Sequence, residues 1–130
     1  MQSSSELLST SEPADASPEA ELALIDQRVM SDWCNDMDRE DVLAILARVP
    51  AECDRSIADF QQAIAAGDLA SSRRTAHRLK GMANNLGAIR LARMARTIEL
   101  GCEDIDDVCS RMPGLELTLA ETLAALRACC

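Results

Sequence analysis

The sequence has few of the residues from which sheets and most catalytic sites are built. Its 130 residues include one histidine, one lysine, one tryptophan and one phenylalanine, and no tyrosine. Alanine and leucine, by contrast, account for 37 residues. Because alanine and leucine favour helices, whereas β-branched and aromatic residues favour strands, the composition predicts an all-α domain.

Missing motifs exclude several functional classes. No apolar run approaches the roughly 20 residues that cross a bilayer, and no basic region followed by an apolar one opens the chain, so we expect a cytoplasmic protein without membrane contact. The sequence has no P-loop or other glycine-rich phosphate cradle, so no ATP site is expected. No nucleophile elbow accompanies the lone histidine, which argues against a catalytic triad.

The six cysteines form no CxxC pair, and one histidine cannot complete a Cys/His zinc set. We therefore expect neither a metal site nor a disulfide framework. Cys102 and Cys109 are seven residues apart, a spacing that allows them to share one helix face as small core residues.

Charge is distributed unevenly along the chain. The net charge of −9 argues against general nucleic-acid binding, which requires a basic surface. Between Ser71 and Ile98, however, no acidic residue occurs, and seven of the thirteen basic residues lie there. This basic zone either attracts an acidic partner or a phosphate, or is an ordinary solvated helix face. Its members are Arg73, Arg74, Arg78, Lys80, Arg90, Arg93 and Arg96.

Hydrophobic periodicity predicts an antiparallel up-and-down four-helix bundle with a short additional N-terminal helix. Residues 1–17, rich in Ser, Glu and Pro, are expected to form a disordered tail or linker, and residues 18–130 the helical domain. The short helix is predicted from Pro18, capped by Ser17, to about Ser31.

Four longer helices are then expected. The first begins after Asp38 and ends at Gly67, and Pro50 predicts either a kink or a boundary between two helices. The next runs from Leu69 to Leu86 and the one after it from near Ala88 to about Cys102, while Ser110 and Pro113 are predicted to start the last.

His77 lies on the polar face of the predicted helix 69–86. At about 100° per residue, Gly81, Arg73, Asn84 and Lys80 fall within roughly 60° of it. Apolar residues occupy a separate arc, which contains Ala76, Leu79, Ala83 and Leu86. A neutral imidazole that points away from the core has a ring nitrogen able to accept a group delivered by another protein.

The neighbours of His77 suit phosphoryl transfer. Lys80 can neutralise a transferred phosphoryl group, and Arg73 can steer or hold an anion. Gly81 is unfavourable in a helix, so its use is either clearance above the imidazole or close helix packing. Asn84 is either a hydrogen-bonding group for a docked partner or a solvated amide.

The stretch around His77 resembles the signature of a known protein family. Ala76-His77-Arg78-Leu79-Lys80-Gly81, followed by Asn85-Leu86-Gly87-Ala88, is similar to the signature of histidine-containing phosphotransfer (HPt) domains. Asp68, Leu91 and the Ile98-Glu99 pair also match the family pattern, and the resemblance covers roughly Asp38 to Ala128. The sequence departs from the pattern at Met82 and Asn84, where small residues are commoner.

The resemblance implies a four-helix bundle that carries a phosphoryl group on His77 between receiver aspartates in a bacterial multistep phosphorelay. It implies that His77 attacks through Nε2, that Lys80 assists, and that Gly81 makes room for the receiver. The implied partners are receiver domains and a hybrid sensor histidine kinase. The protein is then a monomeric carrier and not an enzyme; it binds no cofactor, and the receiver supplies Mg²⁺. The residues expected to contact the partner are Arg73, Arg74, Met82 and Asn84.

Two other hypotheses remain open at this stage. A bundle of the same fold can act as an adaptor that binds or sequesters a receiver or kinase without carrying phosphate. A thiol-based sensor would require reversible oxidation of Cys129 and Cys130, and only their adjacency supports it.

Overall fold

The computed structural model describes residues 22–129, which form five α-helices and no strand. The short α2 comes first and the four long helices follow it. The helices are α2 (Gln27–Asp36), α3 (Arg39–Ala66), α4 (Leu69–Leu86), α5 (Ile89–Gly101) and α6 (Ile105–Cys129). The predicted tail at residues 1–17 lies outside the described residues.

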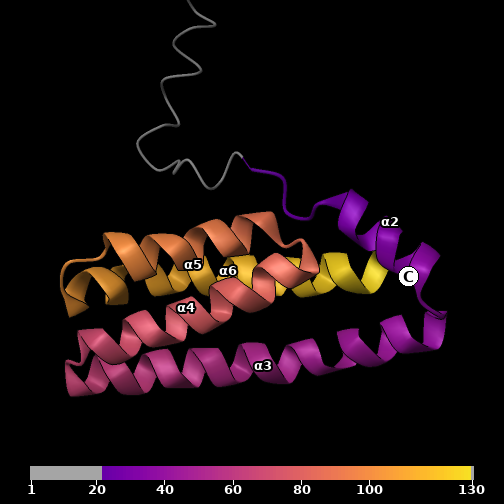
Figure 1. Ribbon diagram of the computed structural model, residues 1–130. Helices are drawn as coiled ribbons and strands as arrows, with labels where there is room; N and C mark the ends of the chain where they lie inside the picture. Colours follow the sequence, from indigo (N-terminus) through magenta and orange to yellow (C-terminus); the bar gives the residue numbers. More distant parts are fainter. Residues whose placement is uncertain (1–21, 130) are drawn as a thin grey trace, which may run out of the picture.

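The four long helices form an antiparallel bundle, as the periodicity predicts (Figure 1). Helices α3, α4 and α5 each pack against the helix that follows. Helix α3 also packs against α6, which closes the bundle. The most extensive packing is between α4 and α5. The additional helix α2 lies at the end of the bundle where α6 finishes (Figure 1).

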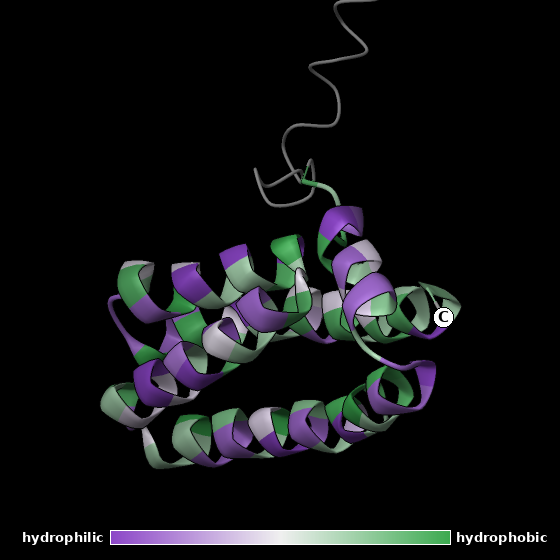
Figure 2. Cartoon of the chain, turned by 45° about the vertical axis from the view of Figure 1, so that its right-hand side comes forward, coloured by the Kyte–Doolittle hydropathy of each residue, from purple (hydrophilic) through white to green (hydrophobic). Residues whose placement is uncertain are grey.

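The core is built from the apolar sides of these amphipathic helices. Figure 2 shows hydrophobic and hydrophilic residues alternating around them. The apolar arc predicted for α4 is buried, since Ala76, Leu79, Ala83 and Leu86 are all in the core. The largest fully buried side chains on the other helices include Met30, Phe60, Leu91, Ile98, Leu115 and Leu126.

Two glycines end helices in the positions that the sequence predicts. Gly67 ends α3 with a φ of 66°, and the carboxylate of Asp68 then accepts hydrogen bonds from the backbone N–H and the hydroxyl of Ser71 (3.1 and 2.7 Å). Gly87 ends α4 with a φ of 71°. Both turns are short, which keeps α3, α4 and α5 as antiparallel neighbours.

The short N-terminal helix begins later than predicted. Pro18 lies outside the described residues, and the segment from Leu22 to Asp26 is not helical. Instead, Asp26 caps α2 by accepting the backbone N–H of Arg28 at 3.0 Å. The backbone N–H of Asp26 donates to the carbonyl of Gly87 at 2.7 Å. This tertiary hydrogen bond ties the start of α2 to the turn after α4.

Two prolines lie inside helices instead of at helix boundaries. Helix α3 is continuous through Pro50, so the alternative of two helices meeting there is wrong. The last helix begins at Ile105, not at Ser110 or Pro113, because the carboxylate of Asp104 accepts the N–H of Asp107 at 2.8 Å and starts the helix earlier.

The shared helix face predicted for two cysteines is also wrong. Cys102 follows α5 as its C-terminal cap and is buried, whereas Cys109 lies in α6 and is exposed. Burial raises the pKa of the Cys102 thiol, and it raises the pKa of the buried Cys53 thiol in α3 to about 11.

Candidate functional site

His77 lies in the middle of α4 with its imidazole turned away from the core. The His77 side chain is 69% exposed, whereas the neighbouring Ala76 and Leu79 are buried. The separation into a polar and an apolar arc therefore holds in the folded chain. A group that approaches from solvent can reach the imidazole directly.

Glu99 of α5 connects His77 to Lys80. One carboxylate oxygen, Oε2, is 2.7 Å from Nδ1 of His77. The other, Oε1, is 2.7 Å from Nζ of Lys80. The Glu99 side chain is only 17% exposed and that of Lys80 24%, so both groups are held against the seam between α4 and α5.

The charge of Glu99 determines the tautomer of the histidine. The ammonium of Lys80 lowers the pKa of Glu99, and the hydrogen bond with His77 lowers it further, so the group is a carboxylate near neutral pH. A carboxylate only accepts hydrogen bonds, so Nδ1 of His77 must carry the proton. In the neutral imidazole Nε2 then has the free electron pair. This arrangement leaves an exposed nucleophilic nitrogen whose ring is oriented by a second residue.

No pattern or motif in the sequence assigns a role to Glu99. The family resemblance included it as part of the Ile98-Glu99 pair, without a function. One signal was available, because Glu99 is the first acidic residue after the acid-free stretch that begins at Ser71. Its contact with His77 nevertheless depends on how α5 packs against α4.

Gly81 is exposed and is not required for helix packing. A Cβ added there would meet no atom within 4 Å. The packing alternative is thus excluded. The absence of a side chain one turn from His77 leaves open space above the site.

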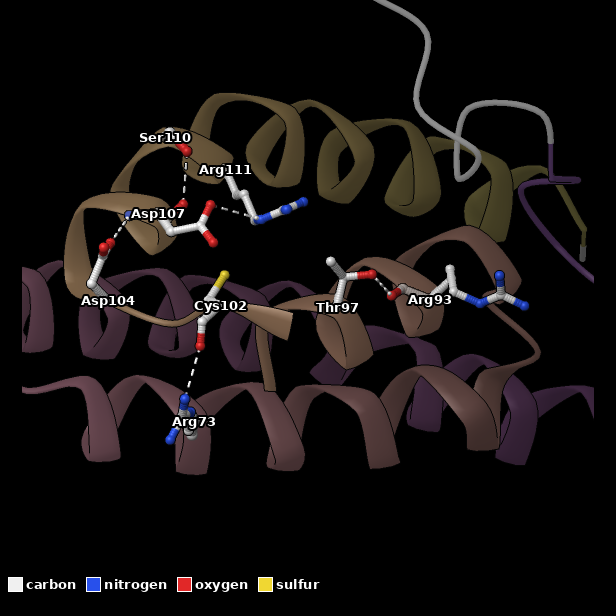
Figure 3. A network of polar contacts seen from close by, with 8 residues as sticks. All are labelled: Arg73, Arg93, Thr97, Cys102, Asp104, Asp107, Ser110 and Arg111. Carbon is white, nitrogen blue, oxygen red and sulfur yellow. Dashed lines mark hydrogen bonds and ion pairs between the residues drawn. The ribbon is translucent and has the colours of Figure 1, made fainter. Parts of the chain in front are cut away.

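The two arginines expected to contact a partner already have acceptors within the chain. Arg73 donates to the carbonyl of Cys102 at 2.8 Å, which ties α4 to the end of α5 (Figure 3). Arg74 donates to the hydroxyl of Ser71 at 2.7 Å and lines a concavity between α3 and α4. Arg73 therefore helps to position the segment that follows α5, in addition to any contact with a partner.

The segment after α5 is braced by further polar contacts (Figure 3). Asp104 accepts the backbone N–H of Asp107, and the carboxylate of Asp107 is 3.4 Å from Nε of Arg111. The hydroxyl of Ser110 donates to the carbonyl of Asp107 at 2.7 Å. These contacts, together with Arg73, hold the connection between α5 and α6.

Asn84 and Met82 lie on different sides of α4. Asn84 is exposed and lines a groove of about 300 Å³ between α4 and α5, together with Lys80. Met82 is half-buried and lines a separate groove with Trp33 of α2 and Ile45 of α3. Asn84 therefore lies in the same groove as Lys80, whereas Met82 lies in a different groove.

Within residues 22–129 no group of three or more His, Cys, Asp or Glu side chains is arranged to hold a metal ion. None of the helices described there is both long and apolar enough to cross a membrane.

Comparison with known proteins adds independent findings. The family model described as Hpt domain matches residues 44–129. Among solved structures, the chain is similar to histidine-containing phosphotransfer protein B from Pseudomonas aeruginosa PAO1, with a TM-score of 0.63 and 25% sequence identity. That match covers 83% of this chain and 91% of the other. Comparison with curated proteins gives no significant match.

Proposed function

The chain belongs to the Hpt domain family, and from this premise we propose that His77 carries a phosphoryl group between receiver-domain aspartates in a multistep phosphorelay. The observation that carries the proposal is the contact between His77 and Glu99. It supplies an exposed imidazole with a protonated Nδ1 and an unprotonated Nε2, the form that attacks phosphorus.

The chemistry needs no base. Nε2 of His77 attacks the phosphorus of an aspartyl phosphate; the N–P bond forms as the bond from phosphorus to the carboxyl oxygen breaks, and the aspartate leaves as a carboxylate. The ring then bears a positive charge and keeps its proton on Nδ1. The carboxylate of Glu99, at 2.7 Å, stabilises that charge without taking the proton. The same steps in reverse deliver the group to another receiver.

Lys80 is placed to neutralise the arriving phosphoryl group. Its ammonium is anchored by Glu99 one helical turn from His77, so little side-chain entropy is lost on transfer. By the family resemblance the receiver supplies the Mg²⁺ ion, and receivers and a hybrid sensor histidine kinase are the proposed partners. Because this chain supplies the nucleophile and its positioning groups, we propose a carrier and not an ATP-dependent enzyme.

The test is transfer of label from phosphorylated receivers. Receiver domains from the source genome are labelled with radioactive phosphate and mixed with the wild-type protein and with His77→Gln. We expect an acid-labile label on the wild type and none on the variant. Equal labelling of both proteins would place the phosphate elsewhere and disprove the role of His77.

The adaptor hypothesis predicts a different result. An adaptor would bind a receiver equally well as wild type and as His77→Gln, and no donor would label it. Measuring binding beside transfer therefore separates the two functions.

A further inference from the structure

Most of the basic zone between Ser71 and Ile98 is already engaged within the chain. Five of its seven cationic side chains contact an oxygen acceptor. Arg73 and Arg90 donate to the backbone carbonyls of Cys102 and Leu22, Arg74 to the hydroxyl of Ser71, and Arg78 and Lys80 pair with Asp59 and Glu99. These five side chains have structural partners.

Arg93 and Arg96 differ from the other five. Both are exposed on α5, and within residues 22–129 neither guanidinium has a hydrogen-bond or ion-pair partner. The interaction drawn at Arg93 in Figure 3 is made by its backbone carbonyl, which accepts the hydroxyl of Thr97. Two exposed, unpaired guanidinium groups in a protein of net charge −9 are available to a partner.

These two arginines share a groove with Lys80. They line the groove of about 300 Å³ between α4 and α5 that Lys80 and Asn84 also line. Lys80 in turn shares Glu99 with His77. The arginines therefore lie on the α5 side of a groove that reaches Lys80, one helical turn from His77.

We propose that Arg93 and Arg96 form a docking surface for the acidic rim of the partner's phosphoryl site, and that they determine which receivers are accepted. This inference rests on the proposed function, because a partner that holds Mg²⁺ beside an aspartyl phosphate binds the ion through carboxylates, which make the surroundings of its site acidic. The negative potential around such a site attracts the two guanidinium groups and draws the partner toward the His77 face.

The surface suits an acidic protein better than a nucleic acid. Phosphate backbones are bound through extended basic surfaces, whereas this patch is small and the chain as a whole is acidic. A local basic patch on an acidic protein instead steers one face toward a complementary face and repels other approaches.

The experiment reverses the charge of the patch. The double variant Arg93→Glu/Arg96→Glu is compared with Arg55→Glu/Arg127→Glu, which changes the net charge equally at exposed positions of α3 and α6. Both are assayed for transfer from the panel of phosphorylated receivers, over a range of salt concentrations. We expect the first variant to lower kcat/KM about tenfold at low salt, with the transfer rate at saturation unchanged. The control variant should stay near wild type, and Arg93→Lys/Arg96→Lys should lose less than the charge reversal because it keeps both positive charges.

A second readout separates this inference from the proposed function. Binding of the same receivers is measured with His77→Gln, with and without the reversal of Arg93 and Arg96. Suppose that no receiver transfers label to the wild-type protein, but that a receiver binds and the charge reversal weakens this binding. The docking surface is then supported and the carrier function is refuted. If label is transferred and the reversal changes neither binding nor kcat/KM, the docking surface is wrong.

Two remaining outcomes also overturn the docking surface. The first is an equal loss in the control variant, which would show that net charge alone matters. The second is a gain in transfer on reversal, which would show that the groove holds an acidic segment of this chain instead of a partner. Absence of any binding refutes both proposals.

Discussion

At the scale of single residues, the carboxylate of Glu99 organises the site through its two oxygens. One oxygen accepts the Nδ1 proton of His77, and the other pairs with the ammonium of Lys80. The same carboxylate thus fixes the tautomer of His77, the proposed nucleophile, and the position of the Lys80 ammonium, which we propose neutralises the phosphoryl group. Its negative charge is maintained because Lys80 and His77 both lower its pKa.

The first prediction concerns the pH dependence of stability in Glu99→Gln. Since the pKa of Glu99 is lower in the folded chain than its ordinary value of 4.5, its ionised form stabilises the fold above that value. This contribution is lost as the pH falls through the depressed folded pKa. The free energy of unfolding should therefore differ between wild type and Glu99→Gln at about pH 7, and the difference should shrink toward about pH 3.

Urea unfolding at the two pH values measures this difference. The other carboxylates with a lowered pKa, Asp26 and Asp68, are present in both proteins, so their contributions cancel. An equal difference at both pH values would mean that the contacts of Glu99 do not depend on its charge.

The second prediction is that Gly81→Ala stabilises the fold but slows phosphotransfer. A Cβ there meets no atom of the free chain, so Gly81→Ala should raise the free energy of unfolding by about 0.5–1 kcal/mol. It should also slow phosphotransfer by about tenfold, because the methyl group occupies the space that an in-line approach requires. Thermal unfolding and transfer assays measure the two effects.

Gly114→Ala is the matched control. Gly114 is also exposed within a helix, and a Cβ there would be 3.5 Å from Cε of Met94, an ordinary contact. It should gain similar stability without loss of transfer. If Gly81→Ala transfers as fast as Gly114→Ala, clearance is not the function of Gly81.

At the scale of elements, the turn between α4 and α5 also forms the seat of α2. A Cβ on Gly87 would be 2.8 Å from Cβ of Val29 and 3.3 Å from the carbonyl of Asp26. The carbonyl of Gly87 also accepts the N–H of Asp26. Gly87 thus serves two purposes, since it allows a positive φ and lets α2 approach the bundle closely.

The third prediction compares Gly87→Ala with Gly67→Ala. Both glycines have a positive φ, which costs about 1–2 kcal/mol for an L-residue, but a Cβ on Gly67 would meet nothing within 4 Å. Gly67→Ala should lose about that amount of stability, whereas Gly87→Ala should lose more and also expose α2. Hydrogen exchange of the α2 amides tests this, and equal losses with α2 still protected would refute the close approach.

Element boundaries were predictable where the capping signal is local. Gly67-Asp68 and Gly87 mark the ends of α3 and α4 in the sequence itself. The proline and serine signals predict the wrong starts for α2 and α6, because the side chains of Asp26 and Asp104 make the actual caps. Pro50 lies within a helix of 28 residues, whose other hydrogen bonds and packing outweigh a local defect.

At the scale of the whole molecule, the core of the described residues contains one fully buried aromatic side chain. Phe60 is completely buried in α3. The fourth prediction is that Phe60→Ala lowers the free energy of unfolding by about 3–5 kcal/mol, because the truncation leaves a cavity. Such a loss is a large part of the 5–15 kcal/mol that is typical of a domain.

Leu100→Ala is the surface control for this measurement. Leu100 is 64% exposed on α5, so its truncation should change stability by less than about 0.5 kcal/mol. Chemical unfolding of both variants compares them directly. Similar losses at the two positions would mean that Phe60 does not anchor the core.

Patterns within the sequence predict the antiparallel bundle of helices, the turns at Gly67 and Gly87, and the face on which His77 lies. These features depend on residues within a few positions of one another: the periodicity of α4, the glycines that end helices and the cap at Asp68. Local geometry is sufficient for them because an α-helix fixes the angle between successive side chains. The identification of His77, Lys80 and Gly81 as one face followed from that angle alone.

The pairing of charges across helices, by contrast, depends on how one helix packs against another. His77 and Glu99 are 22 residues apart, and their contact depends on the rotation of α5 against α4. The same packing places Arg73 on the carbonyl of Cys102 and leaves Arg93 and Arg96 without a partner in the described chain. From the sequence, the seven cationic side chains of the basic zone cannot be divided into paired and unpaired ones. The fold distinguishes them, because it decides which acceptors come within hydrogen-bonding distance of each.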